Sequence, residues 1–254
     1  MKKFKFFIFI SFCFLFFCFG CEKPKEKNID IDNNLQSSDM YVVSSISDAI
    51  YLNPVLASDS ASSSVNSYIY NGLLKYDKDL NLVCDLAESY QISKDGLEIK
   101  FNLKKNILWH DGEPFTVKDV KFTFDKLTDP NTRTPFSSDY LMVKEFKVID
   151  DYSFVVTYAE PFAPILESWG IGIIPEHIFR NEDINKSEYN RKPVGTGPYM
   201  FKKWVTDQKI VLEANPNYYE GVPKIKVCLF RVIPDQSVQF LELRTQTIDE
   251  LSLT

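Results

Sequence analysis

The residues whose types could carry out chemistry are few, and the chain has only 2 His among its 254 residues. His110 opens the run 110–113 (HDGE), in which an imidazole and two carboxylates have the atom types that bind a metal ion. The same run is typical of a polar turn that joins a strand to a helix, which is the interpretation we favour. His177 follows Pro175 and Glu176 and is predicted to lie in the first turn of a helix. We therefore expect no metal site here.

Sequence signatures of catalysis are also missing. No Ser lies in a G-x-S-x-G motif, and no Cys and His have the setting of a nucleophile and its base. The run 195–198 (GTGP) lacks the third Gly of a dinucleotide-binding loop and the Lys of a phosphate-binding loop, so it indicates a tight backbone crossing or a hinge. Asp150 and Asp151 are predicted to lie in a turn, so we interpret them as solvated carboxylates rather than as a catalytic acid and base. The sequence therefore supports neither an enzyme nor a cofactor site.

The charge balance and the cysteines narrow the class of protein further. The chain has 35 Asp and Glu against 29 Lys and Arg, and its first five residues include Lys2, Lys3 and Lys5, so the rest is acidic. We therefore expect no binding to nucleic acid, which needs a basic surface. Cys228 lies in an apolar run and is predicted to be a buried free thiol, with a single disulfide to Cys84 as the open alternative.

Residues 1–20 are predicted to be a signal peptide rather than part of the fold. The uncharged apolar run 6–19 would span about 21 Å as a helix, against a hydrocarbon core of roughly 30 Å. Its end, 18–21 (CFGC), resembles a bacterial lipoprotein signal, in which a small residue precedes the Cys that receives a lipid. We therefore expect lipidation at Cys21 and a membrane anchor; an ordinary secreted protein and an uncleaved anchor are the alternatives. Residues 21–39 are charged and polar, which predicts a flexible tether.

Hydrophobic periodicity predicts short strands and helices after residue 40. Residues 97–103 alternate apolar and polar side chains, as in a half-buried strand, after a turn at 94–96 (KDG). Thr116 is predicted to cap a helix, with Asp119 closing a capping box and the helix ending before Pro130.

Further elements point to a mixed fold. Strands are also expected at 154–158, 210–214 and 225–232. Asp235 is predicted to cap another helix whose apolar side is made by Val238, Phe240 and Leu241. The mixed order of elements predicts an α+β or mixed α/β fold.

Several ordered motifs resemble those of one family, the extracytoplasmic solute-binding proteins of family 5, which serve oligopeptide and dipeptide ABC transporters. The motifs are 86–90 (LAESY), 93–96 (SKDG), 109–116 (WHDGEPFT), 193–199 (PVGTGPY), 210–213 (IVLE) and 215–219 (NPNYY). The resemblance covers residues 41 to 249.

The resemblance implies a lobe of a two-lobed fold, of the type II periplasmic-binding-protein kind, that closes on its ligand about a hinge. The implied divisions are a first-lobe core at 40–71 and 190–254 and an inserted subdomain at 72–189, with the second lobe absent. Family members are about twice as long, so we expect a shortened product whose capture of solute is impaired.

The resemblance also implies ligand contacts from two segments of the first lobe. The segment after Leu52-Asn53-Pro54 supplies Ser58 and Ser60, and an aromatic residue after 129–132 (DPNT) supplies Phe136. Simple packing in the core is the alternative reading of Phe136.

The implied function is solute capture for a peptide ABC transporter in the cell envelope, on the extracytoplasmic side of the membrane. The expected partners are an oligopeptide ligand, the permease subunits and, through the lipid anchor, the membrane; no cofactor is expected. The alternatives are a surface lipoprotein that binds a partner macromolecule, or a nickel-type or haem-type solute binder of the same family.

Overall fold

The computed structural model describes residues 39–161 and 164–251, which belong to one compact unit. The predicted signal peptide, Cys21 and all of the predicted tether except Asp39 lie outside the described residues. Within the described ranges, none of the helices combines the length and the apolar character that crossing a bilayer requires.

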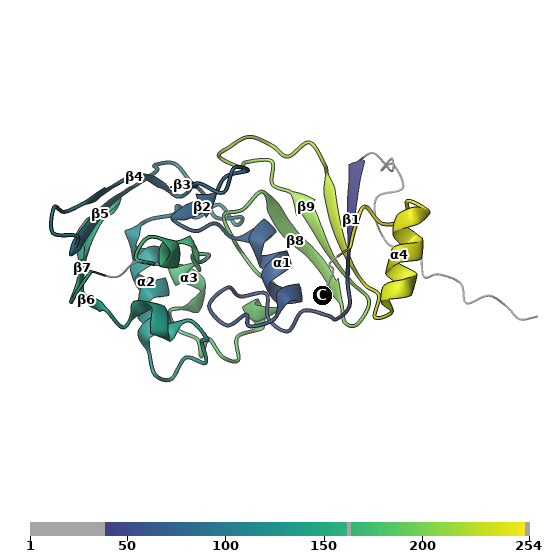
Figure 1. Ribbon diagram of the computed structural model, residues 1–254, viewed down its shortest axis with the longest axis horizontal. Helices are drawn as coiled ribbons and strands as arrows, with labels where there is room; N and C mark the ends of the chain where they lie inside the picture. The colour runs from purple at the N-terminus through teal and green to yellow at the C-terminus, as the bar shows by residue number, and fades with distance from the viewer. Residues whose placement is uncertain (1–38, 162–163, 252–254) are drawn as a thin grey trace, which may run out of the picture. The chain divides into compact units, whose positions relative to one another are not determined.

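The first sheet has five strands in the order β11-β1-β10-β9-β8 (Figure 1). They are β1 (Met40–Ser45), β8 (Tyr199–Val205), β9 (Lys209–Ala214), β10 (Val227–Val232) and β11 (Glu250–Leu251). Strand β1 pairs in parallel with β10 and β11, whereas β8, β9 and β10 form an antiparallel meander. The strands predicted from 210–214 and 225–232 are confirmed as β9 and β10.

The second sheet has four antiparallel strands in the order β4-β5-β7-β6. They are β4 (Ala87–Ile92), β5 (Glu98–Leu103), β6 (Val143–Asp150) and β7 (Ser153–Tyr158). The predicted alternation is confirmed in β5, where Ile99, Phe101 and Leu103 are buried. Gly96 has a φ of +73° and so permits the turn before this strand. Of the two residues predicted to lie in a turn, Asp151 does so between β6 and β7, whereas Asp150 is the last residue of β6.

Helix α2 (Val117–Thr128) covers an aromatic core built on this second sheet. Thr116 caps the helix and closes the predicted capping box with Asp119. Phe124 of the helix has its ring centroid 5.4 Å from that of Phe146, which in turn stacks on Phe154 at 4.6 Å. These rings bury large apolar areas, so they dominate the stability of this part of the fold.

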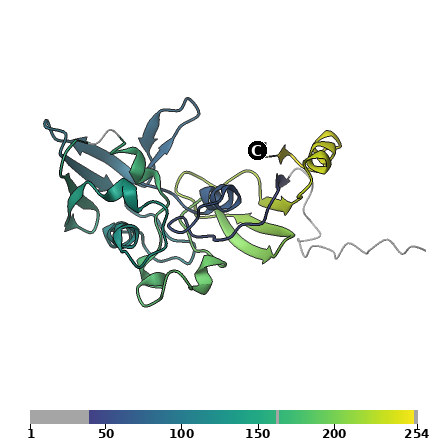
Figure 2. The same cartoon turned by 60° about the horizontal axis from the view of Figure 1, so that its bottom comes forward.

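Helix α1 (Ser60–Ile69) packs on the five-stranded sheet, and both ribbon views show it beside the green strands (Figures 1 and 2). Tyr68 makes edge contacts with Tyr199 of β8 at 5.7 Å and with Phe230 of β10 at 5.4 Å. Asp59 caps the helix by accepting a hydrogen bond from Ser62 N at 2.7 Å.

Helix α4 (Gln236–Arg244) begins after Asp235 as predicted, but its buried side differs from the prediction. Val238, Phe240 and Leu241 were expected to be its apolar contact side, yet they are 43%, 57% and 59% exposed. Gln239 is buried instead, and its Nε2 donates to Ile233 O at 2.7 Å.

Short elements complete the described fold. They are the hairpin β2 (Leu74–Tyr76) and β3 (Leu82–Cys84), helix α3 (Glu176–Phe179), and the 3-10 helices η2 (Ser137–Tyr140), η3 (Glu167–Gly170) and η4 (Glu188–Asn190). His177 lies in the first turn of α3, as predicted. The predicted free thiol of Cys228 is confirmed: it is buried, and neither it nor Cys84 forms a disulfide. The mixed α/β content is confirmed.

Candidate ligand-binding cavity

A cavity of about 640 Å³ opens where α1, the loop before it, β2 and the 3-10 helices η2 and η3 meet. Its size lies within the range of small-molecule sites, which is roughly 300 to 1,000 Å³. Pro54, Phe136 and Ile171 supply part of its apolar surface, and polar side chains such as Ser63, Asn66 and Ser67 also line it. The cavity can therefore bind a ligand that has both apolar and hydrogen-bonding groups.

One wall of the cavity is a polar face of α1. It presents Ser63, Asn66, Ser67 and, just after the helix, Tyr70, which are spaced so that a helix brings them to one side. Tyr70 OH donates to Leu52 O at 3.2 Å, and burial raises the pKa of this phenol, so it stays a neutral donor. This spacing was the available sequence signal, and it was missed because Ser and Asn in a helix resemble an ordinary solvated face.

A second wall rests on the buried carboxylate of Asp85, which is 2% exposed. Asn71 Nδ2 donates to Asp85 Oδ2 at 2.9 Å, and Tyr219 OH donates to Asp85 Oδ1. Lys75 Nζ lies 3.2 Å from the same carboxylate. Burial, followed by the charge of Asp85, raises the pKa of Tyr219, so its hydroxyl remains protonated.

This network gives a structural role to the motif 215–219 (NPNYY), which is far in sequence from the cavity wall that it contacts. Tyr219 reaches Asp85 across 134 residues of sequence, and Thr196 Oγ1 donates to Asn71 Oδ1 at 3.2 Å. The motif therefore ties the loop after β9 to the hairpin that forms the cavity wall. Sequence reasoning found the motif but did not find Asp85.

His110 fastens the crossing at 195–197 to the rest of the fold. Gly195 N donates to His110 Nδ1 at 3.1 Å, so the ring proton sits on Nε2, which donates to Gly197 O at 3.0 Å. Burial lowers the pKa of His110 to about 4, which keeps the ring neutral. Of the run 110–113 that was predicted to be a turn, residues 110–112 form a turn and a bend. Among the residues described by the structure no group of three or more His, Cys, Asp or Glu is placed to hold a metal ion.

The predicted tight crossing is also confirmed. A Cβ on Gly195 would lie 1.9 Å from Ile69 O, and one on Gly197 would lie 2.5 Å from Tyr68 O. These two positions accept no side chain, because the backbone passes directly over the end of α1.

The structure brings one of the three predicted ligand residues to the cavity. Phe136 is half-buried; it lines the cavity and also packs against the core, and its contact with ligand stays a prediction. Ser58 and Ser60 are exposed near the start of α1, and neither lines this cavity. Ser60 borders a separate small hollow of about 30 Å³. The contacts of Ser58 and Ser60 with ligand stay a prediction.

Comparison with known proteins places this fold in a family. Residues 81–253 match the model of the bacterial extracellular solute-binding proteins, family 5 (middle). The chain is 32% identical over 244 residues to the oligopeptide-binding protein AppA of Bacillus subtilis, covering 93% of this chain and 45% of that protein. It is 35% identical over 185 residues to a putative ABC transporter peptide-binding protein of Brucella ovis, covering 70% and 35%.

Solved structures agree with this assignment. AppA of Bacillus subtilis in complex with a nonapeptide superimposes with a TM-score of 0.77 at 33% identity, covering 82% of this chain and 43% of that one. NikZ from Campylobacter jejuni in complex with Ni(L-His) gives 0.78 at 29% identity, covering 84% and 43%. The chain thus spans less than half the length of these relatives and corresponds to one lobe of a periplasmic binding protein. It belongs to the bacterial extracellular solute-binding proteins of family 5.

Proposed function

We propose that this chain is part of the solute-binding component of a peptide ABC transporter, which captures oligopeptides outside the membrane and delivers them to the permease. The cavity beside α1 carries the proposal, because it combines apolar surface with a row of polar groups. The family consists of extracellular proteins that bind solutes, and two of the relatives named above are an oligopeptide-binding protein and a putative ABC transporter peptide-binding protein. No chemical transformation of the solute is part of this function.

The chemistry of the cavity suits a peptide. A peptide repeats one N–H donor and one C=O acceptor per residue, and these need partners when they leave water. The polar face of α1 offers such partners, whereas Pro54, Phe136 and Ile171 offer surface for apolar side chains. We infer that Phe136 contacts an apolar part of the ligand, and that Ser58 and Ser60 contact it nearer the start of α1.

Anchoring at the membrane completes the proposal. A lipid on Cys21 would keep the receptor close to its permease, because acyl chains bury their CH₂ groups in the bilayer. Residues 40–71 and 190–254 would act as the core of the lobe, with 72–189 as a subdomain inserted in it. Metabolic labelling with a clickable fatty acid tests the anchor, since a Cys21→Ser variant is expected to lose the label.

Calorimetry tests the proposed ligand class. The purified gene product is titrated with a mixed library of di- to hexapeptides and, separately, with a nickel–histidine chelate. For the complete receptor we expect saturable binding of peptides, weakened about tenfold in Phe136→Ala, since truncating an aromatic contact that the ligand buries costs on the order of 1 to 2 kcal/mol. Phe240→Ala, which removes an exposed ring on α4, is the matched control and is expected to bind normally.

Two results would contradict this function. Tight binding of the chelate without binding of peptide would assign a metal-complex carrier. Binding of neither solute, together with capture of a macromolecule by the lipid-anchored protein, would assign a surface interaction protein.

A further inference from the structure

We propose that the outer edge of β6 is an interface between two copies of this chain, which pair there as antiparallel strands centred on Phe146. The partner is a second copy of the chain, so this inference is separate from solute capture in the cavity. Three observations carry it: the open edge of β6, the apolar side chains exposed along that edge, and the uncompensated charges of Glu145 and Lys147.

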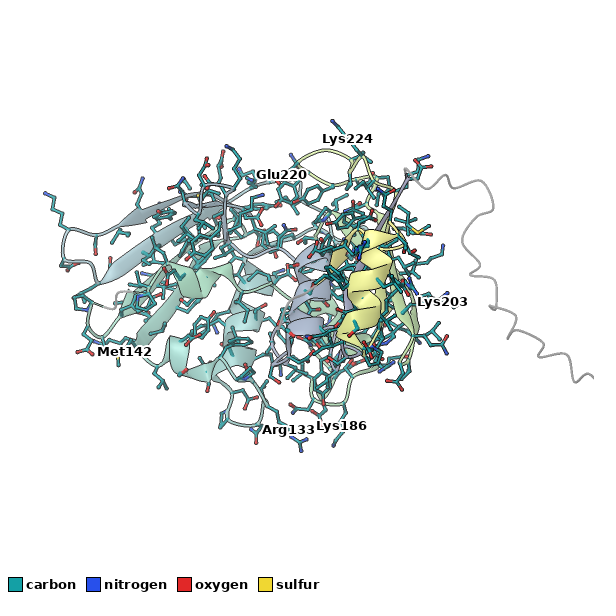
Figure 3. All side chains as sticks on the ribbon, turned by 45° about the vertical axis from the view of Figure 1, so that its right-hand side comes forward. Arg133, Met142, Lys186, Lys203, Glu220 and Lys224 are labelled. Atoms are coloured by element: carbon teal, nitrogen blue, oxygen red, sulfur yellow. The ribbon has the colours of Figure 1, made fainter. Side chains whose placement is uncertain are left out.

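Strand β6 is an outer strand of the four-stranded sheet, and among the described residues it pairs only with β7. Figure 1 shows it at the margin of this sheet, and Met142, labelled in Figure 3, lies just before the strand, toward one end of the molecule. With 8 residues β6 is the longest of the described strands, whereas β11, at the edge of the other sheet, has 2. Free N–H and C=O groups along an edge accept another strand, and proteins usually prevent this with short edge strands or Pro. The long, Pro-free edge of β6 is therefore open to pairing.

Large apolar side chains are exposed along the same edge. Val148 is 49% exposed, Ile149 is 50% exposed, and Leu141, which lies shortly before the strand, is 74% exposed. Residues from Glu145 to Val148 pair regularly with β7, so Val148 lies on the same face of the sheet as Phe146. A second copy of β6 beside the first would remove part of this apolar surface from water, which favours association.

The charges on the opposite face of β6 favour one register. Glu145 and Lys147 are exposed, and because they are two positions apart their side chains both lie on the face away from Phe146. Neither forms an ion pair with another residue that the structure describes. When Phe146 of one copy lies opposite Phe146 of the other, Glu145 of each copy lies opposite Lys147 of the other. Two pairs of opposite charge then form at once, and such directly opposed pairs stabilise neighbouring strands.

Neighbouring registers lose this complementarity. Moving the centre by half a residue toward the amino end sets Lys144 opposite Lys147, and moving it the other way sets Glu145 opposite Val148. Like charges that lie directly opposite each other destabilise the pairing. The charges therefore select the register that is centred on Phe146.

The other long edge strands are not complementary to themselves in this way. Edge strand β8 carries Lys202 and Lys203 but no carboxylate, and Glu88 is the charged residue of edge strand β4. Two copies of either strand would bring like charges together. Strand β5 repeats the pattern of β6 with Glu98 and Lys100, but it lies between β4 and β7 and has no free edge. It therefore supplies a matched control.

Sedimentation equilibrium of the purified gene product, in density-matched detergent, measures the association. We expect a monomer–dimer equilibrium at concentrations up to about 0.5 mM, because one pair of strands makes a small and therefore weak interface. Glu145→Lys and Lys147→Glu, made singly, each turn both attractive pairs into repulsive ones and are expected to weaken dimerisation about fivefold or more. The double variant exchanges the two charges and restores both pairs, so we expect it to dimerise as the wild type does.

The matched control reverses the same charges on the interior strand. Glu98 and Glu145 are both opposite Thr157 of β7, and Lys100 and Lys147 are both opposite Val155, so these charges lie on the same face. Glu98→Lys and Lys100→Glu change the net charge by the same amounts as the β6 variants, and each is expected to dimerise like the wild type. Thermal unfolding of every variant shows whether it is folded.

Cysteine variants test the register directly. Residues directly opposite each other have Cα atoms about 4.5 to 5.5 Å apart, which suits a disulfide. An equal mixture of Glu145→Cys and Lys147→Cys chains is expected, on mild oxidation, to link position 145 of one copy to position 147 of another. Mass spectrometry of the linked peptides identifies the bond. Each variant alone is expected to form few links through its new cysteine, because the two copies of that position are not opposite each other.

The outcomes decide the inference without reference to solute binding. Dimers that are weakened by both single reversals and recover in the double variant, with the link between positions 145 and 147, support it. Monomers at every concentration, dimers that the β6 reversals leave unchanged, or links at other positions of β6 overturn it. Because peptide is absent from these measurements, each of these results leaves the proposed function standing.

Discussion

His110 shows how a residue with the chemistry of a metal ligand or a catalytic base can serve structure instead. Both of its ring nitrogens are engaged by the backbone at Gly195 and Gly197, so neither is free for a solute or a metal. The ring must be neutral to accept from Gly195 N, and burial enforces this state by lowering the pKa. The ring therefore acts as a clamp on the crossing.

The clamp predicts a specific dependence of stability on pH. The pKa of His110 falls from 6.5 to about 4 on folding, so between these values the unfolded chain binds a proton that the folded chain does not. The free energy of unfolding therefore decreases as pH falls from 6.5 to about 4, with about 3 kcal/mol lost in total. Urea unfolding at pH 7.5, 6, 5 and 4 measures this loss of unfolding free energy.

Variants isolate the contribution of this one ring. His110→Gln is expected to be less stable at pH 7.5 and to show a shallower decline toward pH 5, since its amide does not titrate. His177→Gln removes the other imidazole, which lies at the surface 2.8 Å from Asp111, and is expected to keep the wild-type decline. An unchanged slope in His110→Gln would show that other groups cause the decline.

At the scale of elements, the contact between α1 and the segment before β8 decides how the cavity wall is placed. The backbone at Gly195 lies against Ile69 O at the end of α1, and Gly197 N donates to the same oxygen at 2.8 Å. The polar face of α1 is therefore positioned by a segment far away in sequence.

Substituting this crossing glycine should be costly. In Gly195→Ala the new Cβ would meet Ile69 O, so backbone must shift, and we expect a loss of at least about 3 kcal/mol or failure to fold. Gly170→Ala places its Cβ 3.5 Å from Leu74 O, an ordinary contact, and is expected to cost less than about 1 kcal/mol. Chemical denaturation of both variants measures their free energies of unfolding. Similar losses of stability in the two variants would mean that the backbone at Gly195 can move to accommodate a side chain.

At the scale of the whole molecule, the two large sheets are joined by interactions that neither makes alone. Tyr219, on the loop between β9 and β10 of the five-stranded sheet, donates a hydrogen bond to Asp85, which lies between the hairpin and β4 of the second sheet. His110, which follows β5, adds a second connection through Gly195. Because these links are buried or half-buried, breaking them exposes unpaired polar groups.

We therefore expect the described residues to unfold as one cooperative unit. Hydrogen exchange under native conditions is expected to give similar opening free energies for amides in β5 and β7 and for amides in β9 and β10. A Tyr219→Phe variant removes the hydrogen bond to Asp85. We expect it to lower the opening free energy of one sheet more than that of the other. Separate opening energies in the wild type would show that the inserted subdomain and the core are independent.

Local patterns in the sequence determined much of the fold. The capping box at Thr116 and Asp119, the alternation through β5 and the cap at Asp235 each depend on residues within a few positions, so the sequence displays them directly. The ordered motifs indicated the family, which the comparisons confirm. The same local reasoning failed for α4, where Gln239 is buried and Phe240 is exposed, because the side that a helix buries depends on what packs against it.

Only the tertiary structure decided the site. Asp85 looks like any surface carboxylate in the sequence, and it becomes a buried hub because Tyr219 reaches it from 134 residues away. Asn66 reads as a solvated helix residue until the fold places it in the cavity wall with an unpaired oxygen. Periodicity records which way a side chain points along its own element, whereas burial, charge compensation and unpaired donors or acceptors depend on what distant segments bring beside it.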